Sequence, residues 1–310
     1  MYDNIDFKIK SYDVTRIDFL KETPKHFEVT GEHNYHGSLV ISGSLNGYKI
    51  TVSERGVNVE DGSLCKFYLG DNFQTLNRSD VKKAIEKLSD TLHLPFEQAT
   101  VSRIDAAQNF IVKHPTEVYF NHLGEYIHNK RLVQPNGLYY KNHKGLLIFY
   151  DKLKEQKDKG QNIPKLYKDR FTLRYEQRHR ARLKDTFKAE RVTGAMLYDE
   201  AFYMQIIDKW QEAYKRIQKI NDVNINFNAM TGKKDLYMLG LASLIFQQGG
   251  ELNLLQQIKE AQQRQDLTKK QARDLRQAIK EASQCNIGMV QNDAILELNK
   301  KIDEAVKFYR

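Results

Sequence analysis

Residues 100–112, TVSRIDAAQNFIV, alternate apolar and polar side chains over most of their length. Because successive side chains of a β-strand point to opposite faces, this pattern predicts a half-buried strand. The two faces hold Ile104, Ala106 and Phe110 on the apolar side, and Arg103, Asp105 and Asn109 on the polar side. The strand therefore carries an acidic side chain, Asp105, away from the core.

Further short β-rich runs lie on both sides of this strand in the sequence. Residues 1–75 contain several of them, separated by turn sequences rich in glycine and asparagine, which is typical of an antiparallel meander. The runs GLLIFYDK, residues 145–152, and RFTLRYEQRH, residues 170–179, continue the sheet. The second run places four polar residues on one face, namely Thr172, Arg174, Glu176 and Arg178.

Helical spacing appears first at residues 79–94, with Ser79 as the expected N-cap, and predicts a helix packed on the sheet. Beyond Arg191 apolar residues recur at three- and four-residue steps, which predicts helices throughout. We therefore expect an α+β fold, an antiparallel sheet with helices on one face, followed by an all-helical C-terminal region. The expected boundary separates a catalytic domain at residues 1–190 from a helical region at residues 191–310.

Within the helical region, Thr268 and Gln271 have the spacing of a capping box between two helices. Such a pair could be a helix-turn-helix that reads duplex DNA. Ordinary helical hairpins are commoner, so a role in assembly or partner binding is the main expectation for this region.

The chain has 310 residues and a formal net charge of +9. Residues 151–190 hold 13 lysines and arginines against seven acidic residues, so most of the excess is clustered in one stretch. Clustered positive charge favours a polyanionic partner, and nucleic acid is the leading one, although a solvated charged surface would give the same composition.

Cysteine usage and hydropathy bear on the compartment. Cys65 and Cys285 are too few to form a disulfide framework or a metal cage, and each is expected to be a small buried residue. No stretch approaches the length of a membrane span. We therefore expect a protein of the reducing cytoplasm, without a membrane partner.

Three strand segments each present a reactive side chain: Asp105, Tyr150 and Glu176. Two carboxylates on neighbouring strands could hold Mg²⁺ or Mn²⁺ through oxygen ligands, and a tyrosine beside the ion could attack phosphorus. The alternative is structural, with both carboxylates paired to neighbouring arginines and Tyr150 half-buried. The residues alone leave the two interpretations open.

Four strings in order carry a resemblance to a known family. They are GSLCKFYLGDNFQTL, VSRIDAAQNF, GLYYKNHKGLLIFYDKLKEQ and RFTLRYEQR. Together they resemble the replication initiation proteins of filamentous phages and the related rolling-circle initiators of plasmids. The resemblance covers roughly residues 1–190, and RIDAAQNF with LLIFYDK is more specific as a pair than either string alone.

The resemblance implies roles for particular residues. Asp105 would be a metal ligand, Tyr150 the nicking nucleophile and Glu176 a second ligand. Asn109 stands where many relatives have a second aspartate, so it would ligate through its carbonyl oxygen or leave the ion one charge short. His179 is a candidate third ligand or proton-transfer group. Lys152 would lower the tyrosine pKa or bind the scissile phosphate if it shares the face of the phenol.

The expected DNA contacts fall into three groups. The exposed lysines of the basic stretch would bind the backbone, Tyr140 and Tyr167 would stack on unpaired bases, and arginines on the sheet face offer a second surface. The lysines are Lys154, Lys157 and Lys159, and the arginines are Arg103, Arg174 and Arg178.

The expected function is initiation of rolling-circle replication in the cytoplasm of a bacterial host. The protein would nick one strand of its origin, bind single- and double-stranded DNA, and hand a 3′-hydroxyl to a host polymerase. No Walker-type sequence is present, so unwinding would need a host helicase. Whether the chain acts as a homodimer is left open. The rival interpretation is a non-catalytic origin-binding or regulatory protein, which does not require Tyr150.

Overall fold

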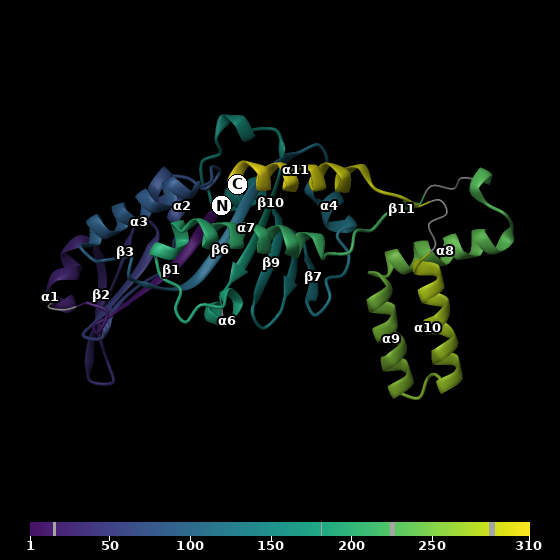
Figure 1. Ribbon diagram of the computed structural model, residues 1–310, viewed down its shortest axis with the longest axis horizontal. Helices are drawn as coiled ribbons and strands as arrows, with labels where there is room; N and C mark the ends of the chain where they lie inside the picture. The colour runs from purple at the N-terminus through teal and green to yellow at the C-terminus, as the bar shows by residue number, and fades with distance from the viewer. Residues whose placement is uncertain (15–16, 181, 224–226, 285–288) are drawn as a thin grey trace.

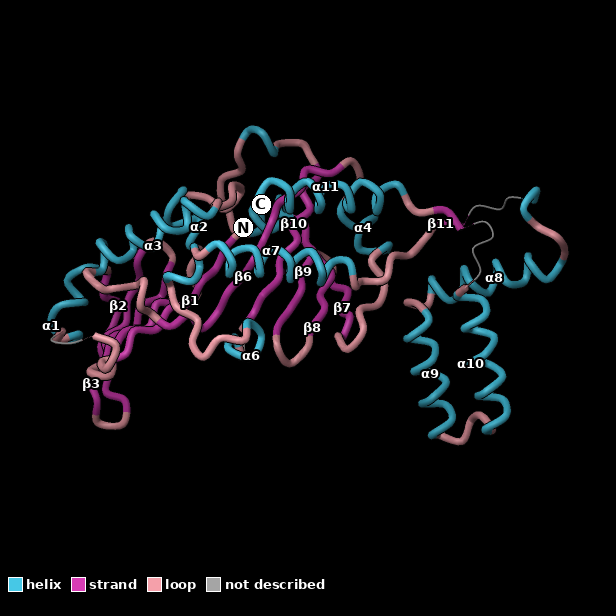
Figure 2. The backbone as a smooth tube through the Cα atoms, in the orientation of Figure 1, coloured by secondary structure: helices cyan, strands magenta, loops and turns pink. Residues whose placement is uncertain are grey.

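The computed structural model describes residues 1–14, 17–180, 182–223, 227–284 and 289–310. Figure 1 shows a long sheet with helices along it, and a separate group of helices beyond one end. A small two-stranded ribbon joins β11 (Asp222–Val223) and β12 (Met289–Val290), and Figure 2 labels β11 between the sheet and this group.

The main sheet has ten strands in the order β2-β3-β4-β5-β1-β6-β10-β9-β8-β7, and every neighbouring pair is antiparallel. Tight turns connect the outer strands. Asn46 and Gly47 both take positive φ between β3 and β4, as a two-residue hairpin turn requires. The strands are β1 (Tyr2–Lys10), β2 (Glu28–Tyr35), β3 (Ser38–Leu45), β4 (Tyr48–Ser53), β5 (Gly56–Glu60), β6 (Thr100–Val112), β7 (Lys130–Gln134), β8 (Gly137–Lys141), β9 (Gly145–Asp151) and β10 (Phe171–His179).

The predicted alternation along β6 and β10 is confirmed, but the prediction that β6 is half-buried is wrong, because Arg103, Asp105 and Asn109 on its polar face are buried as well. On β6, Phe110 faces the helices and packs near Trp210 of α7 (Glu200–Lys215). On β10, Tyr175 stacks between Phe149 and the same tryptophan, with ring centroids 4.5 and 4.7 Å away. Apolar and aromatic burial thus fixes one face of these strands, and their charged residues lie on the other.

Helices cover the aromatic face. The described helices are α1 (Phe19–Glu22), α2 (Leu64–Leu69), α3 (Arg78–Leu92), α4 (Thr116–His122), α5 (Lys152–Asp158), α6 (Leu183–Phe187), α7 (Glu200–Lys215), α8 (Lys233–Gln247), α9 (Glu251–Gln263), α10 (Lys269–Ser283) and α11 (Asp293–Tyr309). Short 3₁₀ turns lie at Thr23–His26, Lys165–Tyr167, Ala195–Tyr198 and Phe227–Ala229.

Two capping predictions have different outcomes. Asn77, rather than Ser79, caps α3, because its side chain accepts from the Asp80 backbone while the Asp80 side chain accepts from the Asn77 backbone. The predicted capping box of Thr268 and Gln271 at the start of α10 is confirmed.

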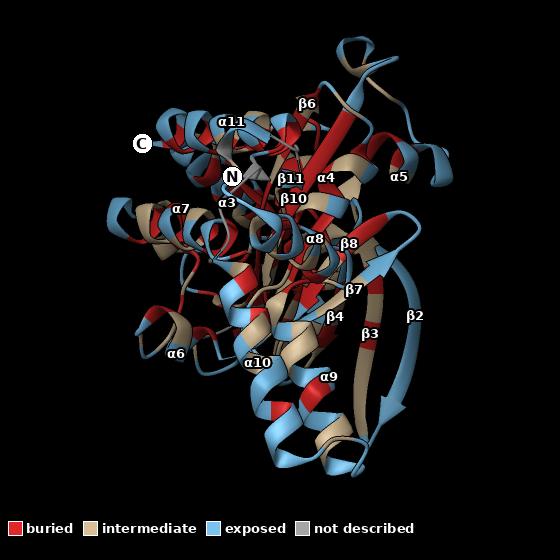
Figure 3. Ribbon diagram, turned by 90° about the vertical axis from the view of Figure 1, so that its right-hand side faces the viewer, coloured by how far each residue is buried: buried red, intermediate tan, exposed pale blue. Residues whose placement is uncertain are grey.

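The boundary expected near residue 190 does not separate two packing units. Both α7 and α11 belong to the core of the sheet, with Trp210, Ile206 and Leu298 fully buried there. A second, smaller core joins only α8, α9 and α10 around Ile245, Ile258 and Ile279. The helical group is thus an insertion between α7 and α11, and Figure 3 shows that α9 and α10 consist mostly of exposed and intermediate residues.

The α+β fold class is confirmed. Cys65 is buried with a free thiol, as expected, and Cys285 lies outside the described residues. None of the helices in the described part of the chain has the length and hydropathy needed to cross a membrane.

Candidate active site

The central strands bring the predicted residues to the charged face of the sheet. Arg174 of β10 lies opposite Asn109 of β6 on one side and Tyr150 of β9 on the other. Four residues along β10, Arg178 lies opposite Asp105. Residues two apart on a strand share a face, so these side chains and Glu176, which lies between the two rows, point the same way.

Asp105 is fully buried and is held by two arginines. Arg103 Nε lies 3.0 and 3.1 Å from the two carboxylate oxygens, and Arg178 Nε lies 3.6 Å from Oδ2. Burial raises the pKa of Asp105 to about 7; the Arg103 hydrogen bond opposes this shift, and the charge of Glu176 adds to it. Burial thus favours the neutral form of Asp105, whereas the two arginines favour its charged form.

Glu176 links the second arginine to the tyrosine. Its Oε1 accepts from Arg178 Nε at 2.5 Å, and its Oε2 lies 3.5 Å from both Arg174 Nε and the Tyr150 hydroxyl. Burial raises the pKa of Tyr150 well above its ordinary value, although Arg174 acts to lower it. The phenol is thus protonated at neutral pH, next to a carboxylate that can accept its proton.

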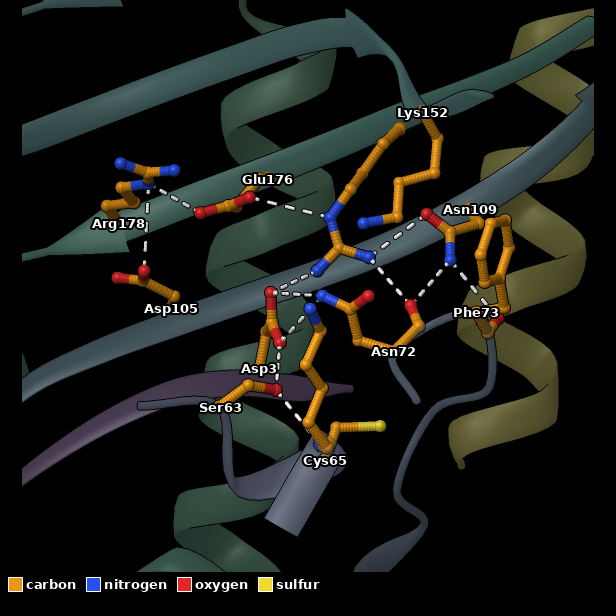
Figure 4. Close-up of polar contacts among 12 residues, drawn as sticks. Asp3, Ser63, Cys65, Asn72, Phe73, Asp105, Asn109, Lys152, Glu176 and Arg178 are labelled. Atoms are coloured by element: carbon orange, nitrogen blue, oxygen red, sulfur yellow. Dashed lines mark hydrogen bonds and ion pairs between the residues drawn. The ribbon is translucent and has the colours of Figure 1, made fainter. Parts of the chain in front are cut away.

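Arg174 is the centre of the network and is 1% exposed. Its guanidinium donates to Asp3, to the Asn72 carbonyl at 3.2 Å and to the Asn109 side-chain oxygen at 3.0 Å (Figure 4). The Asn109 amide in turn donates to the Asn72 and Phe73 carbonyls. Every polar atom of the Asn109 side chain is therefore engaged within the protein.

Lys152 follows the strand that carries Tyr150. β9 ends at Asp151, whose side chain caps α5, so Lys152 is the first residue of a helix. Its ammonium is buried, donates to Glu155 at 2.8 Å and lies 5.6 Å from the Phe73 ring centroid. Burial, together with the charge of Arg174, lowers the pKa of Lys152 to about 8, while Glu155 opposes that shift.

A cleft of about 600 Å³ opens beside these residues. Tyr150, Glu176 and Arg178 line it together with Tyr139 of the neighbouring strand β8. Lys159 and Gln161, which follow α5, form part of its wall. Because Tyr150 lines this cleft, a phosphate can reach its hydroxyl from solvent there.

The donor set does not fit a divalent cation in this arrangement. Both predicted carboxylates are taken by arginines, and the Asn109 oxygen accepts from Arg174. Over residues 1–310, leaving aside those outside the described ranges, no group of three or more His, Cys, Asp and Glu side chains is placed to hold a metal. An ion could reach Asp105 and Glu176 only by displacing an arginine.

The predicted site residues His179, Tyr140 and Tyr167 do not line the cleft. His179 packs on the helix side of the sheet against Phe187, so it does not meet Glu176. Tyr140 is fully buried and its hydroxyl donates to the carbonyls of residues 123 and 124, which leaves no ring face open to a base. Tyr167 is half-buried against Phe73, with ring centroids 4.6 Å apart.

The residues predicted to form a basic surface lie in two different environments. Lys154 and Lys157 on α5 and Lys159 after it are exposed, although Lys159 pairs with Glu155. Arg103 and Arg174 are buried in ion pairs with Asp105 and Asp3, and Arg178 is a quarter exposed at the cleft. The lysines are thus open to a polyanion, whereas two of the three arginines are parts of the scaffold.

Asp3, Asn72 and Tyr139 were not predicted as site residues. Asp3 comes from the first strand, which sits in the middle of the sheet, and Asn72 from the loop after α2. No local pattern reveals either. Tyr139 could have been found, because it lies opposite Ile148, two residues from Tyr150 on the predicted hairpin.

Comparison with known proteins identifies the family of the chain. A family model described as the N-terminal part of a phage replication-associated protein, the gene II protein, matches residues 1–213, which is more than half of the chain and contains every residue of the cleft. A search of the curated proteins finds no match. The class is that of phage proteins associated with DNA replication.

The chain belongs to the gene II family of replication-associated proteins. This membership confirms the predicted resemblance to the filamentous-phage initiators, and it supports the interpretation of the chain as an initiator of rolling-circle replication.

Proposed function

We propose that the chain nicks one strand of its origin through Tyr150 and later rejoins it. The phenolic oxygen attacks the scissile phosphorus, an O–P bond forms to the tyrosine, and the bond from phosphorus to the 3′ oxygen breaks. The products are a 5′-phosphotyrosyl strand and a free 3′-hydroxyl. Because the bond energy is kept in the phosphotyrosyl link, attack by a 3′-hydroxyl can reverse the step without ATP.

One observation carries this proposal: the Tyr150 hydroxyl and the Glu176 carboxylate face the same open cleft, 3.5 Å apart. Glu176 is placed to accept the phenolic proton as the oxygen attacks. The distance is at the long end for a hydrogen bond, and such contacts tighten when substrate binds. The proton delivered to the leaving 3′ oxygen comes from the same pair or from water.

Cations around the tyrosine supply the charge that this step needs. Arg174 favours the phenolate, and Arg178, partly exposed at the cleft, is available to a phosphate oxygen. Lys152 lies buried behind the site near Arg174 and adds to the positive field. In this proposal the arginines provide part of the charge neutralisation that a metal ion would provide.

Dependence on Mg²⁺ or Mn²⁺ is a separate proposal that rests on the resemblance and on the position of Asp105 and Glu176 on neighbouring strands. The arginine pairing of Asp105 and Glu176 does not favour it, and we derive no step from an ion. Asp105→Asn and Glu176→Gln should each remove nicking if the carboxylates act at all. Full nicking in excess chelator would refute the metal requirement, and loss that returns with either ion would support it.

The exposed lysines of α5 support DNA binding at the rim of the cleft. We propose that Lys154, Lys157 and Lys159 hold the phosphate backbone of origin DNA, single- or double-stranded. A host polymerase would extend the 3′-hydroxyl and a host helicase would unwind the duplex, in the cytoplasm of a bacterial host. Association into a homodimer is a further proposal that sedimentation of the protein on origin DNA would test.

A second candidate is a non-catalytic origin-binding protein. The closed ion-pair network and the raised pKa of Tyr150 favour it, because both describe a tyrosine held neutral in a stable scaffold. In this case the cleft would dock phosphates without reacting.

Incubation with labelled supercoiled DNA that carries the chain's own origin tests the proposal. The wild type should leave a covalent adduct in denaturing gels, and Tyr150→Phe should bind DNA equally well but form none. Tyr139→Phe is the matched control, since it removes the other hydroxyl from the same cleft. An adduct that persists in Tyr150→Phe and vanishes in Tyr139→Phe would move the nucleophile to Tyr139, and no adduct from the wild type would favour the non-catalytic candidate.

A further inference from the structure

A second pocket lies on the helix side of the sheet, away from Tyr150. It has a volume of about 260 Å³ and is walled by the ends of β9 and β10, by α6 and by α7. Gln177 and His179 of β10, Thr186 of α6 and Lys209 of α7 line it, with Tyr126 at one side. None of these five residues lines the cleft on the other face, and Arg178 is the lining residue that the two pockets share.

Three buried polar atoms of this pocket have no hydrogen-bond partner within the described protein: the Gln177 side-chain oxygen, His179 Nε2 and the Thr186 hydroxyl. His179 is 8% exposed, so its ring cannot turn to bulk water. Native proteins rarely leave buried polar atoms unpaired, and three in one cavity point to an occupant with complementary donors and acceptors.

The lining holds four cationic side chains, Lys144, Arg178, Lys209 and Arg216, against the two carboxylates of Asp185 and Glu212, so the balance of charge favours an anionic group beside the polar wall. Among the described residues no carboxylate lies within ion-pair distance of the Lys209 ammonium, which sits 5.8 Å from the Phe187 ring centroid. Arg216 and Glu212, which also line the pocket, pair with each other. Burial and the nearby charge of Lys209 lower the pKa of His179 to about 4, so its ring is neutral at physiological pH and Nε2 can donate or accept.

We propose that this pocket binds one nucleoside monophosphate unit, with the base edge against Gln177, His179 and Thr186 and the phosphate toward Lys209. A base edge offers both donors and acceptors, and a phosphate suits an unpaired ammonium. The volume of about 260 Å³ limits the occupant to about one nucleotide and excludes a longer stretch of strand. The unit comes either as a free mononucleotide or as one unstacked nucleotide of a DNA strand.

Calorimetric titration of the full chain with each of the four deoxynucleoside 5′-monophosphates, and with a short single-stranded oligonucleotide, tests the proposal. Thr186→Val keeps the side-chain shape and should weaken binding of the nucleotide about three- to tenfold, the effect of losing one hydrogen bond. Lys209→Gln should weaken nucleotide binding but leave binding of the matching nucleoside unchanged. Lys215→Gln, an exposed lysine of α7 outside the pocket, is the control and should have no effect.

The outcomes distinguish a free mononucleotide from one nucleotide of a DNA strand. Binding of a free nucleotide that both pocket variants weaken assigns the pocket to mononucleotides. Oligonucleotide binding that the same variants weaken, without competition from free nucleotides, assigns it to a DNA strand. If neither ligand binds, or if the pocket variants bind as the wild type does, the pocket holds only water and the proposal fails. Tyr150→Phe should behave as wild type in all arms, so this result is independent of nicking.

Discussion

Replacing Arg174 by methionine removes the cation at the centre of the charged face while keeping much of the side-chain volume. Asp3 and Glu176, which are 6% and 2% exposed, would then lose a buried partner. Removing one partner of a buried ion pair costs about 3–5 kcal/mol, because the other charge stays out of water. The hydrogen bonds to Asn72 and Asn109 would be lost as well. We therefore expect the free energy of unfolding to fall by about 4 kcal/mol.

Urea unfolding followed by fluorescence measures this loss, because Trp210 is the single tryptophan and packs against Tyr175 of the same strand as Arg174. Adding Asp3→Asn to Arg174→Met should restore part of the stability, since the stranded carboxylate is then neutral. Lys154→Met, at an exposed position of α5, should change stability by at most about 0.5 kcal/mol. A decrease in the free energy of unfolding below about 1 kcal/mol for Arg174→Met would refute the buried network and make Arg174 a candidate DNA-binding residue again.

Three further predictions concern other parts of the chain. Lys154→Ala and Lys157→Ala should each flatten the log–log salt dependence of DNA binding by roughly one unit, and an unchanged slope would place the DNA elsewhere. His179 is buried with its pKa lowered to about 4, so it binds fewer protons in the folded state than in the unfolded state between pH 4 and 6.5; its own contribution to stability is full above pH 6.5 and falls by up to about 3 kcal/mol as pH drops to 4, opposite in sign to that of Asp105. In urea titrations His179→Gln should therefore lose less stability than the wild type between pH 6.5 and 4, and an identical pH dependence in the two proteins would exclude this histidine. Trp210→Ala should lower the free energy of unfolding by about 3–5 kcal/mol, because the ring is fully buried. Urea unfolding followed by circular dichroism measures this loss, and a small loss would mean that α7 is loosely packed.

Because side chains alternate between the two faces of a strand, much of the charged face could be predicted from the sequence. Alternation alone placed Asp105, Asn109, Arg174 and Glu176 on one side, because burial of Phe110 and Tyr175 fixes the other. The same alternation argues against His179 as a partner of Glu176. It lies three residues after Glu176, so in a regular strand it must point to the opposite face.

Alternation does not predict which residue forms an ion pair with each charged side chain. The pairing of Asp105 with Arg103 and of Arg174 with Asp3 depends on strand order and on the balance of desolvation against attraction. A related limit applies to the domain boundary expected near residue 190. Helical periodicity shows that α7 has an apolar face, but it does not say whether sheet or helix covers that face.

The position of β1 in the middle of the sheet governs when the protein can fold. Asp3 and Arg174 are 171 positions apart, and β6 pairs with β1 on one side and β10 on the other. A chain emerging from the ribosome therefore lacks half of the central pairing until residue 179 has appeared. Closing so large a loop costs little in stability, since each doubling of length adds only about 0.6 kcal/mol, but non-local pairing slows the search for the native state. The two outer meanders can form early from local contacts, and the cleft between them is completed last.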